Sequence, residues 1–198
     1  MTEIVLVRHA ATAWTGTRYC GRSDPPLSKD GLMAAARLAA DLGPTLAPDW
    51  VVVSSPSIRA LATAGAIVSG AGLDRAVEVD DRWREADLGL AEGRTFDELA
   101  ALAPELAAAL AGGTLAIDWP GGETHRSLAT RVAAAWDGLV ERGRSAVVVT
   151  HAGPLMQALA ITQRRAIGPD DLVGSAAFAR VLVGAEGRDA APVLRSRS

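Results

Sequence analysis

The sequence predicts an α/β protein, a three-layer α/β/α sandwich whose central sheet is mostly parallel. Its β-branched apolar runs are short and continuous rather than alternating, which is typical of strands covered on both faces. Helical patterns with recognisable caps and stops lie between these runs. Because strands and helices alternate along the chain, crossover connections should place helices on both faces of the sheet.

The strands are expected where valine and other apolar residues form continuous runs. These runs cover residues 4–7, 51–53, 146–149 and 178–183, and a weaker candidate covers residues 76–79. All are short enough for strands, and none shows the spacing of an amphipathic helix. They therefore supply the sheet.

Four helical patterns are expected between the strands. Ser28 should cap the first helix, which Gly43 ends, while Ser55 and Pro56 should cap and start the second. The third pattern covers residues 124–142 and places four apolar residues on one face: Leu128, Val132, Trp136 and Leu139. The fourth runs from about Pro154 to Leu159.

The chain of 198 residues fits one ordinary domain, for which we expect the bounds 1–184. Residues 81–120 do not follow the strand–helix rhythm and carry several glycines and prolines around an Ala/Leu-rich helical piece. We interpret them as an insertion over one end of the sheet. Residues 185–198 form a polar tail that we expect to be partly disordered.

The composition excludes several classes of protein. Basic and acidic residues number 20 and 23, for a net charge of −3, which does not suggest nucleic-acid binding. Cys20 has no partner for an internal disulfide. No apolar run approaches the length of a membrane span, and the first residues lack the pattern of a signal peptide. We expect a soluble, cytoplasmic protein that binds no membrane.

Charged and polar side chains follow three of the predicted strands. Arg8 and His9 end the first strand, Arg59 lies just beyond the second in the following helix, and His151 follows the third. In an open parallel sheet, ligands bind outside the carboxyl ends of the strands. We therefore expect these four side chains to face one crevice.

The same side chains predict a bound phosphate. A buried arginine cannot lose its charge, and Arg59 in a first helical turn faces the positive end of the helix dipole. The cluster would hold donors without acceptors, a conflict that a phosphate dianion resolves because arginine binds its oxygens bidentately. Each residue alone also has an ordinary structural explanation, such as a buried ion pair for Arg8 or a solvated helix surface for Arg59.

The motifs around these residues resemble those of the histidine phosphatase superfamily, which includes the cofactor-dependent phosphoglycerate mutases. The matching segments stand in the expected order over residues 3–160: Arg8-His9, Asp24-Pro25-Pro26-Leu27-Ser28, Ser54-Ser55-Pro56-Ser57-Ile58-Arg59-Ala60, Arg84-Glu85-Ala86-Asp87-Leu88-Gly89, Glu92-Gly93, Pro120-Gly121-Gly122-Glu123-Thr124 and Thr150-His151-Ala152-Gly153. The chain departs from the family pattern at five positions: Ala10, Ala11, Thr15, Leu88 and Ala91.

The resemblance implies a phosphomonoester hydrolase that acts on a small phosphorylated metabolite. His9 would be the nucleophile and form a phosphohistidine that water hydrolyses, with its ring kept uncharged by the nearby arginines. Arg8, Arg59 and His151 would hold the phosphoryl oxygens, with His151 protonated once the dianion binds, and Glu85 would protonate the leaving group. Further substrate-binding residues would be Thr15, Cys20, Gly21 and Ala152.

No metal or cofactor is expected. The three histidines lie far apart in the sequence, and no carboxylates stand at ligand spacing around them. We therefore predict turnover in excess EDTA. Neither a serine-hydrolase elbow nor a Walker loop is present in the sequence.

Other interpretations stay open. The chain could be a phosphoglycerate mutase, or a non-catalytic phosphate-binding module that has kept the fold. The segment from Arg18 to Arg22 also resembles phosphatases acting on α-ribazole phosphate. The expected partner is a small phosphorylated substrate. The oligomeric state is open, and a homodimer is one option.

Overall fold

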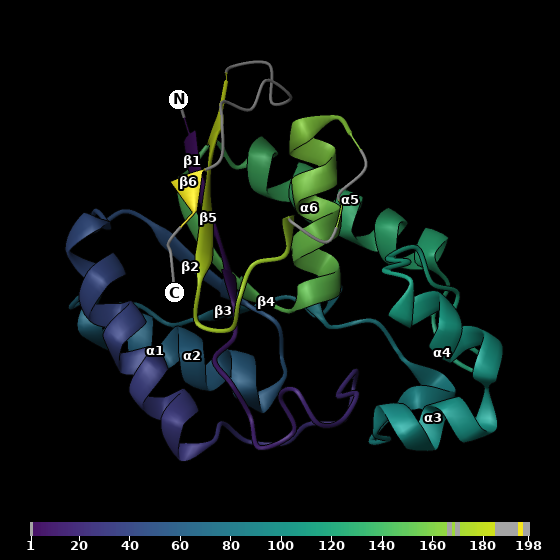
Figure 1. Cartoon of the computed structure of the whole chain (residues 1–198). Coiled ribbons are helices and arrows are strands. Elements are labelled where there is room, and N and C mark those ends of the chain that lie inside the picture. Colours follow the sequence, from purple (N-terminus) through teal and green to yellow (C-terminus); the bar gives the residue numbers. More distant parts are fainter. Residues whose placement is uncertain (1, 166–167, 169–170, 185–193, 196–198) are drawn as a thin grey trace.

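A central sheet organises the part of the chain that the computed structural model describes, residues 2–165, 168, 171–184 and 194–195 (Figure 1). The sheet has six strands. Their bounds are β1 (Thr2–Arg8), β2 (Val51–Ser54), β3 (Glu78–Val79), β4 (Ala146–Thr150), β5 (Phe178–Val183) and β6 (Leu194–Arg195). The predicted strands are all present, although β3 is shorter than expected.

The strand order is β3-β2-β4-β1-β5-β6, and the first four strands of this order run parallel. β5 and β6 are antiparallel to their neighbours. This arrangement confirms the predicted mostly parallel sheet. The register pairs Arg8 with Thr150, so the carboxyl ends of β1 and β4 lie side by side. β2 flanks β4 on its other side, and its exit joins the same edge.

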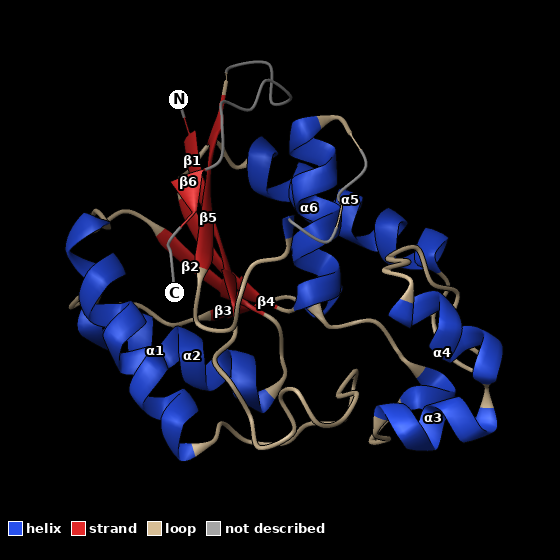
Figure 2. Ribbon diagram, viewed as in Figure 1, coloured by secondary structure: helices blue, strands red, loops and turns tan. Residues whose placement is uncertain are grey.

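Helices cover both faces of the sheet, as Figure 2 shows. α1 and α2 lie on one face, and α5 and α6 lie on the other (Figure 1). The helix bounds are α1 (Lys29–Leu42), α2 (Ile58–Gly70), α3 (Phe96–Leu102), α4 (Pro104–Ala111), α5 (His125–Glu141) and α6 (Ala152–Gln163). Short 3-10 turns are η1 (Gly43–Thr45), η2 (Asp81–Trp83) and η3 (Gly89–Ala91). The three-layer prediction is confirmed.

The two layers of core follow from the alternation of side chains along the buried strands. Ile4 and Leu6 pack with apolar residues of α5 and α6, whereas Val5 and Val7 pack with those of α1 and α2. All four are fully buried. A strand buried on both faces must be apolar at every position, which explains the continuous runs in the sequence.

Two helix starts differ from the prediction. α2 begins at Ile58, and Ser55 does not cap it; the carboxylate of Asp24 instead accepts the Ile58 N–H at 2.9 Å. α6 begins at Ala152, two residues before Pro154, because His151 already takes the N-cap position. A carboxylate from a distant loop can cap a helix as well as a local serine can, and no local pattern announces it.

Residues 81–120 contain two helices where the sequence suggested one helical piece. A capping box of Thr95 and Glu98 starts α3, and Pro104 starts α4. Leu99 and Trp83 are fully buried and anchor this region to the cluster beneath α5 and α6. Figure 1 shows α3 and α4 set apart from the sheet, on the same side as α5 and α6.

The predicted polar tail, residues 185–198, falls mostly outside the described residues. Its two described residues, Leu194–Arg195, form β6 and pair antiparallel with β5, which the sequence did not predict. Among the described helices, none is long and apolar enough to cross a membrane.

Candidate active site

The strand ends bring four predicted residues together. The His9 N–H donates to the Thr150 carbonyl at 2.9 Å, which places His9 beside the exit of β4. The His9 and His151 rings meet edge to face, with centroids 5.0 Å apart. Arg59, from the first turn of α2, contacts both rings. Parallel pairing of strands far apart in the sequence therefore assembles the cluster.

The hydrogen bonds of His9 define the protonation of its ring. Nδ1 lies 2.7 Å from the Ala10 carbonyl, which only accepts, so Nδ1 carries the proton. Nε2 accepts from Arg59 Nε at 3.3 Å and therefore holds the free electron pair. The ring is neutral, as predicted. Burial lowers its pKa to about 3, more strongly than Arg59 and Arg8 do, whereas the sequence argument had credited the arginines.

Arg59 uses all the N–H groups of its guanidinium within the protein. It is fully buried and donates to His9 Nε2, Ser23 O, Asp24 Oδ1, Gly21 O and His151 Nδ1 at 2.7–3.3 Å. The expectation of donors without acceptors is therefore wrong for this arginine. The Asp24 carboxylate also caps α2 and offsets the helix dipole, which removes the second conflict that the sequence suggested.

His151 is a neutral ring held beneath the cavity. Its Nδ1 accepts from Arg59, so the proton lies on Nε2, which donates to Ser55 Oγ at 2.7 Å. Burial, followed by His9 and Arg59, lowers its pKa well below the usual value. The ring is fully buried and does not line the cavity. Its role as a protonated donor once a dianion binds stays a prediction.

Arg8 has one buried hydrogen-bond donor without a partner among the described residues. One of its terminal N–H groups donates to the Val173 carbonyl at 3.0 Å, while Nε is buried without a partner among the described residues. A buried unpaired donor costs about 1–3 kcal/mol, and more when charged, so an anion here would be stabilised. Burial lowers the pKa of Arg8 and Glu85 raises it, but a guanidinium stays protonated.

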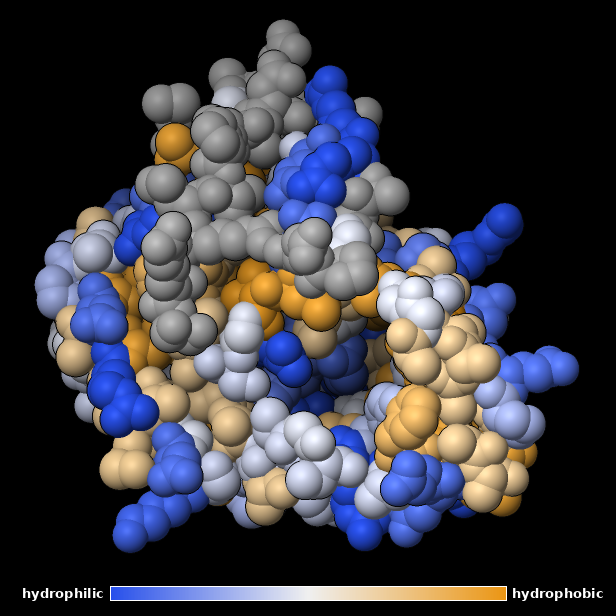
Figure 3. All heavy atoms as spheres, in the orientation of Figure 1, coloured by the Kyte–Doolittle hydropathy of each residue, from blue (hydrophilic) through white to orange (hydrophobic). Residues whose placement is uncertain are grey.

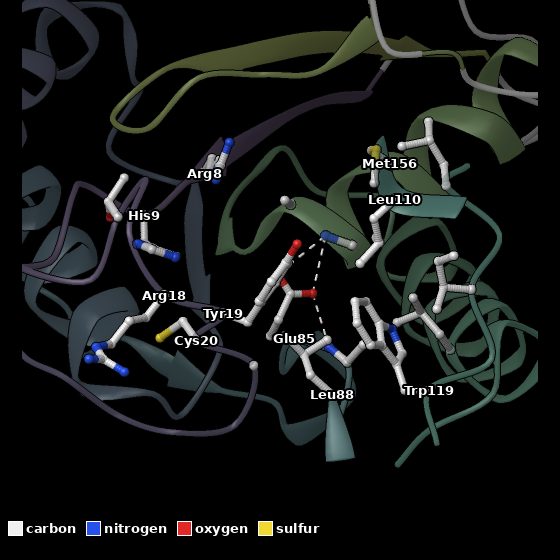
Figure 4. A pocket seen from close by; sticks show the side chains of 18 of the residues that line it. Arg8, His9, Arg18, Tyr19, Cys20, Glu85, Leu88, Leu110, Trp119 and Met156 are labelled. Carbon is white, nitrogen blue, oxygen red and sulfur yellow. Dashed lines mark hydrogen bonds between the residues drawn. The ribbon is translucent and has the colours of Figure 1, made fainter. Parts of the chain in front are cut away.

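Glu85 lies in the cavity wall between the two groups of side chains labelled in Figure 4. Its Oε1 accepts from the backbone N–H groups of Ala86 and Gly153, at 2.9 and 3.1 Å. Burial raises the pKa of this carboxyl, while the two N–H groups and the arginines oppose that shift. The raised pKa favours a carboxylic acid that can donate a proton.

Thr15, Cys20, Gly21 and Ala152 all line the cavity, as does Glu85. The Thr15 hydroxyl accepts from Thr12 N–H at 2.9 Å. The Cys20 thiol donates to the Ser23 carbonyl at 3.4 Å. These contacts tie the side chains to the 12–23 loop, and their role towards a substrate stays a prediction.

Sequence reasoning assigned no site role to two carboxylates that shape this loop. Asp24 pairs with Arg59, and Glu92 accepts from Arg22 N, from Ser23 N and Oγ, and from Leu88 N at 2.6–3.1 Å. Glu92 thereby fixes the carbonyls of Gly21 and Ser23 that hold Arg59. Both carboxylates belong to the family motifs, and this membership was the sequence feature that could have identified them as site residues.

The cavity has a volume of about 350 Å³ and opens as a hollow on the face shown in Figure 3, with hydrophilic residues at its floor. We call Arg8, His9 and Arg59 its basic end. Its apolar end consists of Leu88, Leu110, Leu115, Ile117, Leu128 and Met156. Figure 4 shows Leu110 and Met156 across the cavity from His9. Within the described residues, no cluster of three or more potential ligands could hold a metal ion.

Comparisons with known proteins identify the family of the chain. The family model "Histidine phosphatase superfamily (branch 1)" matches residues 4–170. The chain is 34% identical over 157 residues to a probable phosphoglycerate mutase GpmB of Salmonella paratyphi C, covering 76% of this chain and 70% of that one.

Two solved structures are similar over most of the chain. One is a mycobacterial glucosyl-3-phosphoglycerate phosphatase, with a TM-score of 0.78, 27% identity, and coverage of 91% of this chain and 89% of that one. The other is YhfR of Bacillus stearothermophilus, with a TM-score of 0.83, 25% identity, and coverage of 96% and 95%. These similarities include both a phosphatase and a probable mutase. The chain belongs to branch 1 of the histidine phosphatase superfamily.

Proposed function

We propose that the protein hydrolyses phosphomonoesters through a phosphohistidine on His9. The observation that carries the proposal is the neutral ring of His9, whose Nδ1–H donates to Ala10 and whose Nε2 electron pair faces Arg59. A nucleophile needs such an electron pair, and a phosphoryl group needs nearby positive charge. Arg8 and Arg59 supply that charge within one cluster.

The reaction would run in two steps. His9 Nε2 forms a bond to phosphorus while the bond from phosphorus to the ester oxygen breaks, and Glu85 gives its proton to that oxygen. Water then attacks phosphorus while the bond from phosphorus to His9 Nε2 breaks and its electron pair returns to the ring. The Glu85 carboxylate takes one proton of the water, and inorganic phosphate leaves. Arg59 must release the His9 electron pair before attack, so substrate has to displace its Nε contact. The buried Nε of Arg8 is available to a phosphoryl oxygen.

A mutase is the second candidate, because the Salmonella relative is named a probable phosphoglycerate mutase. A mutase would pass the phosphoryl group from His9 to a second hydroxyl rather than to water. Such an enzyme must hold a second anionic group, and the apolar end offers none of the required cations among the described residues. This favours the hydrolase.

Brief mixing with radiolabelled phosphomonoesters, followed by quenching in base, tests the proposal. We expect an acid-labile, base-stable label on the wild-type protein and none on His9→Ala, with inorganic phosphate as the product in excess EDTA. Transfer of the label to a second alcohol without release of phosphate would favour the mutase. Binding of phosphate without any label or turnover would favour a non-catalytic module.

A further inference from the structure

The cavity is larger than a phosphoryl group requires. Its volume of about 350 Å³ lies within the range of pockets that enclose whole small molecules, roughly 300–1,000 Å³. The basic end occupies one side, with Arg8 and His9 across from Leu110 and Met156 in Figure 4. The remaining space must therefore receive the leaving group of the ester.

Among the described residues, the apolar end has no arginine or lysine to offer that leaving group. The arginines that line the described cavity are Arg8, Arg18 and Arg59. Arg8 and Arg59 belong to the basic end. Arg18, whose Nη1 donates to the Gly93 carbonyl and the Glu98 carboxylate at 2.7 and 3.2 Å, lies on the same side of the cavity as His9, away from Leu110 and Met156 (Figure 4). A carboxylate on the leaving group would lose its hydration without gaining a partner, which is strongly unfavourable.

Aromatic rings add flat apolar surface to the same cavity. Tyr19 and Trp119 both line it, with ring centroids 6.2 Å apart and planes inclined at 59°. Figure 4 shows Tyr19 next to Glu85, with Trp119 on the far side from His9. Rings arranged in this tilted way favour contact with another ring through offset or edge-to-face packing.

Gln157 and His125 form a hydrogen-bonded pair in the cavity wall. Gln157 Nε2 donates to His125 Nε2 at 2.9 Å, and both residues line the cavity. The amide oxygen of Gln157 is left to accept a hydrogen bond from a ligand. His125, to which the sequence analysis gave no role, is part of the cavity wall. This pair suits a hydroxyl or amide on the substrate rather than an ion.

We propose that the substrate is the phosphomonoester of a bulky, uncharged, mainly apolar alcohol that carries a ring system. The inference rests on the proposed phosphatase function and adds the class of its leaving group. It separates this chain from an enzyme acting on phosphoglycerate, whose carboxylate would need a cation at the apolar end. Apolar contact would supply binding energy there, and the basic end would serve all substrates alike.

Turnover of three esters with similarly basic alkoxide leaving groups tests the class: naphthylethyl phosphate, ethyl phosphate and phosphoglycerate. Since each leaving group needs the same proton, differences in kcat/KM report contacts with the rest of the molecule. We expect naphthylethyl phosphate to exceed ethyl phosphate by about 100-fold, from burial of its ring system. Phosphoglycerate should not exceed ethyl phosphate.

Leu110→Arg is the informative variant, because it places a cation at the apolar end. We expect it to lower the naphthylethyl preference and to raise kcat/KM for phosphoglycerate by about 10-fold, a gain that misfolding cannot produce. The matched control is Leu32→Arg, since Leu32 is an exposed leucine of α1 (56% exposed) that lies outside the cavity. The control should keep the wild-type order of substrates.

The outcomes separate this inference from the function on which it rests. Turnover and a His9 label with phosphoglycerate equal to or above naphthylethyl phosphate would overturn the substrate class and leave the phosphatase intact. No label and no turnover with any ester would overturn the phosphatase and the substrate class together.

Discussion

The basic end and the apolar end of the cavity are built in different ways. At the basic end, Arg8 and His9 stand at the exit of β1, where backbone hydrogen bonds fix their distance from the exit of β4, and Arg59 lies in the first turn of α2. Leu110 and Trp119 come from residues 81–120, where two short helices and loops replace the sheet. On the proposed function, the sheet edge would fix the chemistry of the site, and residues 81–120 would contribute to the choice of the alcohol.

Removing the proposed nucleophile at the sheet edge is the strongest test of this difference between the two ends of the cavity. His9→Asn should lower kcat/KM by at least about 10⁴-fold for every ester, because the residue acts on the phosphoryl group that all substrates share. Steady-state assays over the ester series measure the loss. A loss confined to particular alcohols would contradict the division between the two ends.

Glu85→Gln should produce a loss that depends on the leaving group. Its amide cannot donate a proton, so alkyl phosphates should lose about 10²–10⁴-fold in kcat/KM. An aryl phosphate such as nitrophenyl phosphate should lose far less, since its phenolate leaves without a proton. Glu141→Gln is the matched control, because Glu141 is an exposed glutamate at the end of α5, outside the cavity. Equal losses for alkyl and aryl esters would argue against the general-acid role.

Glu92→Gln should lower kcat/KM less than these changes do, because Glu92 acts indirectly by holding the loop at residues 20–24. The neutral amide would accept fewer of the backbone N–H groups of Arg22, Ser23 and Leu88, and the carbonyls that hold Arg59 would shift. We expect kcat/KM to fall by about 10-fold for all esters, as for a misplaced positioning group. A fall in thermal stability with unchanged kcat and KM would show that Glu92 supports the fold alone.

How much the sequence predicts also differs between the two ends. Hydrophobic runs predict the strands and the helices on both faces of the sheet. The rule that the ends of parallel strands share an edge predicts that four side chains meet there: Arg8, His9, Arg59 and His151. These features can be predicted because each buried strand is a continuous apolar run, which can be recognised in the sequence without knowledge of distant contacts. The register then brings the side chains together.

The remaining features depend on contacts between distant residues, which no local pattern contains. Asp24 caps α2 from 34 positions away, so Ser55 becomes free to bind His151, 96 positions away. The pairing of Tyr19 with Trp119 depends in the same way on the path of residues 81–120. The family motifs named Asp24 and Glu92 without revealing that they organise Arg59.

The most direct test is heteronuclear NMR of the ring nitrogens of His9 in the unliganded protein. The structure predicts a neutral ring with the proton on Nδ1 from about pH 8 down to about pH 4, well below the ordinary pKa of about 6.5. A His9 ring that gains its second proton near neutral pH, or that carries its single proton on Nε2, would contradict the account.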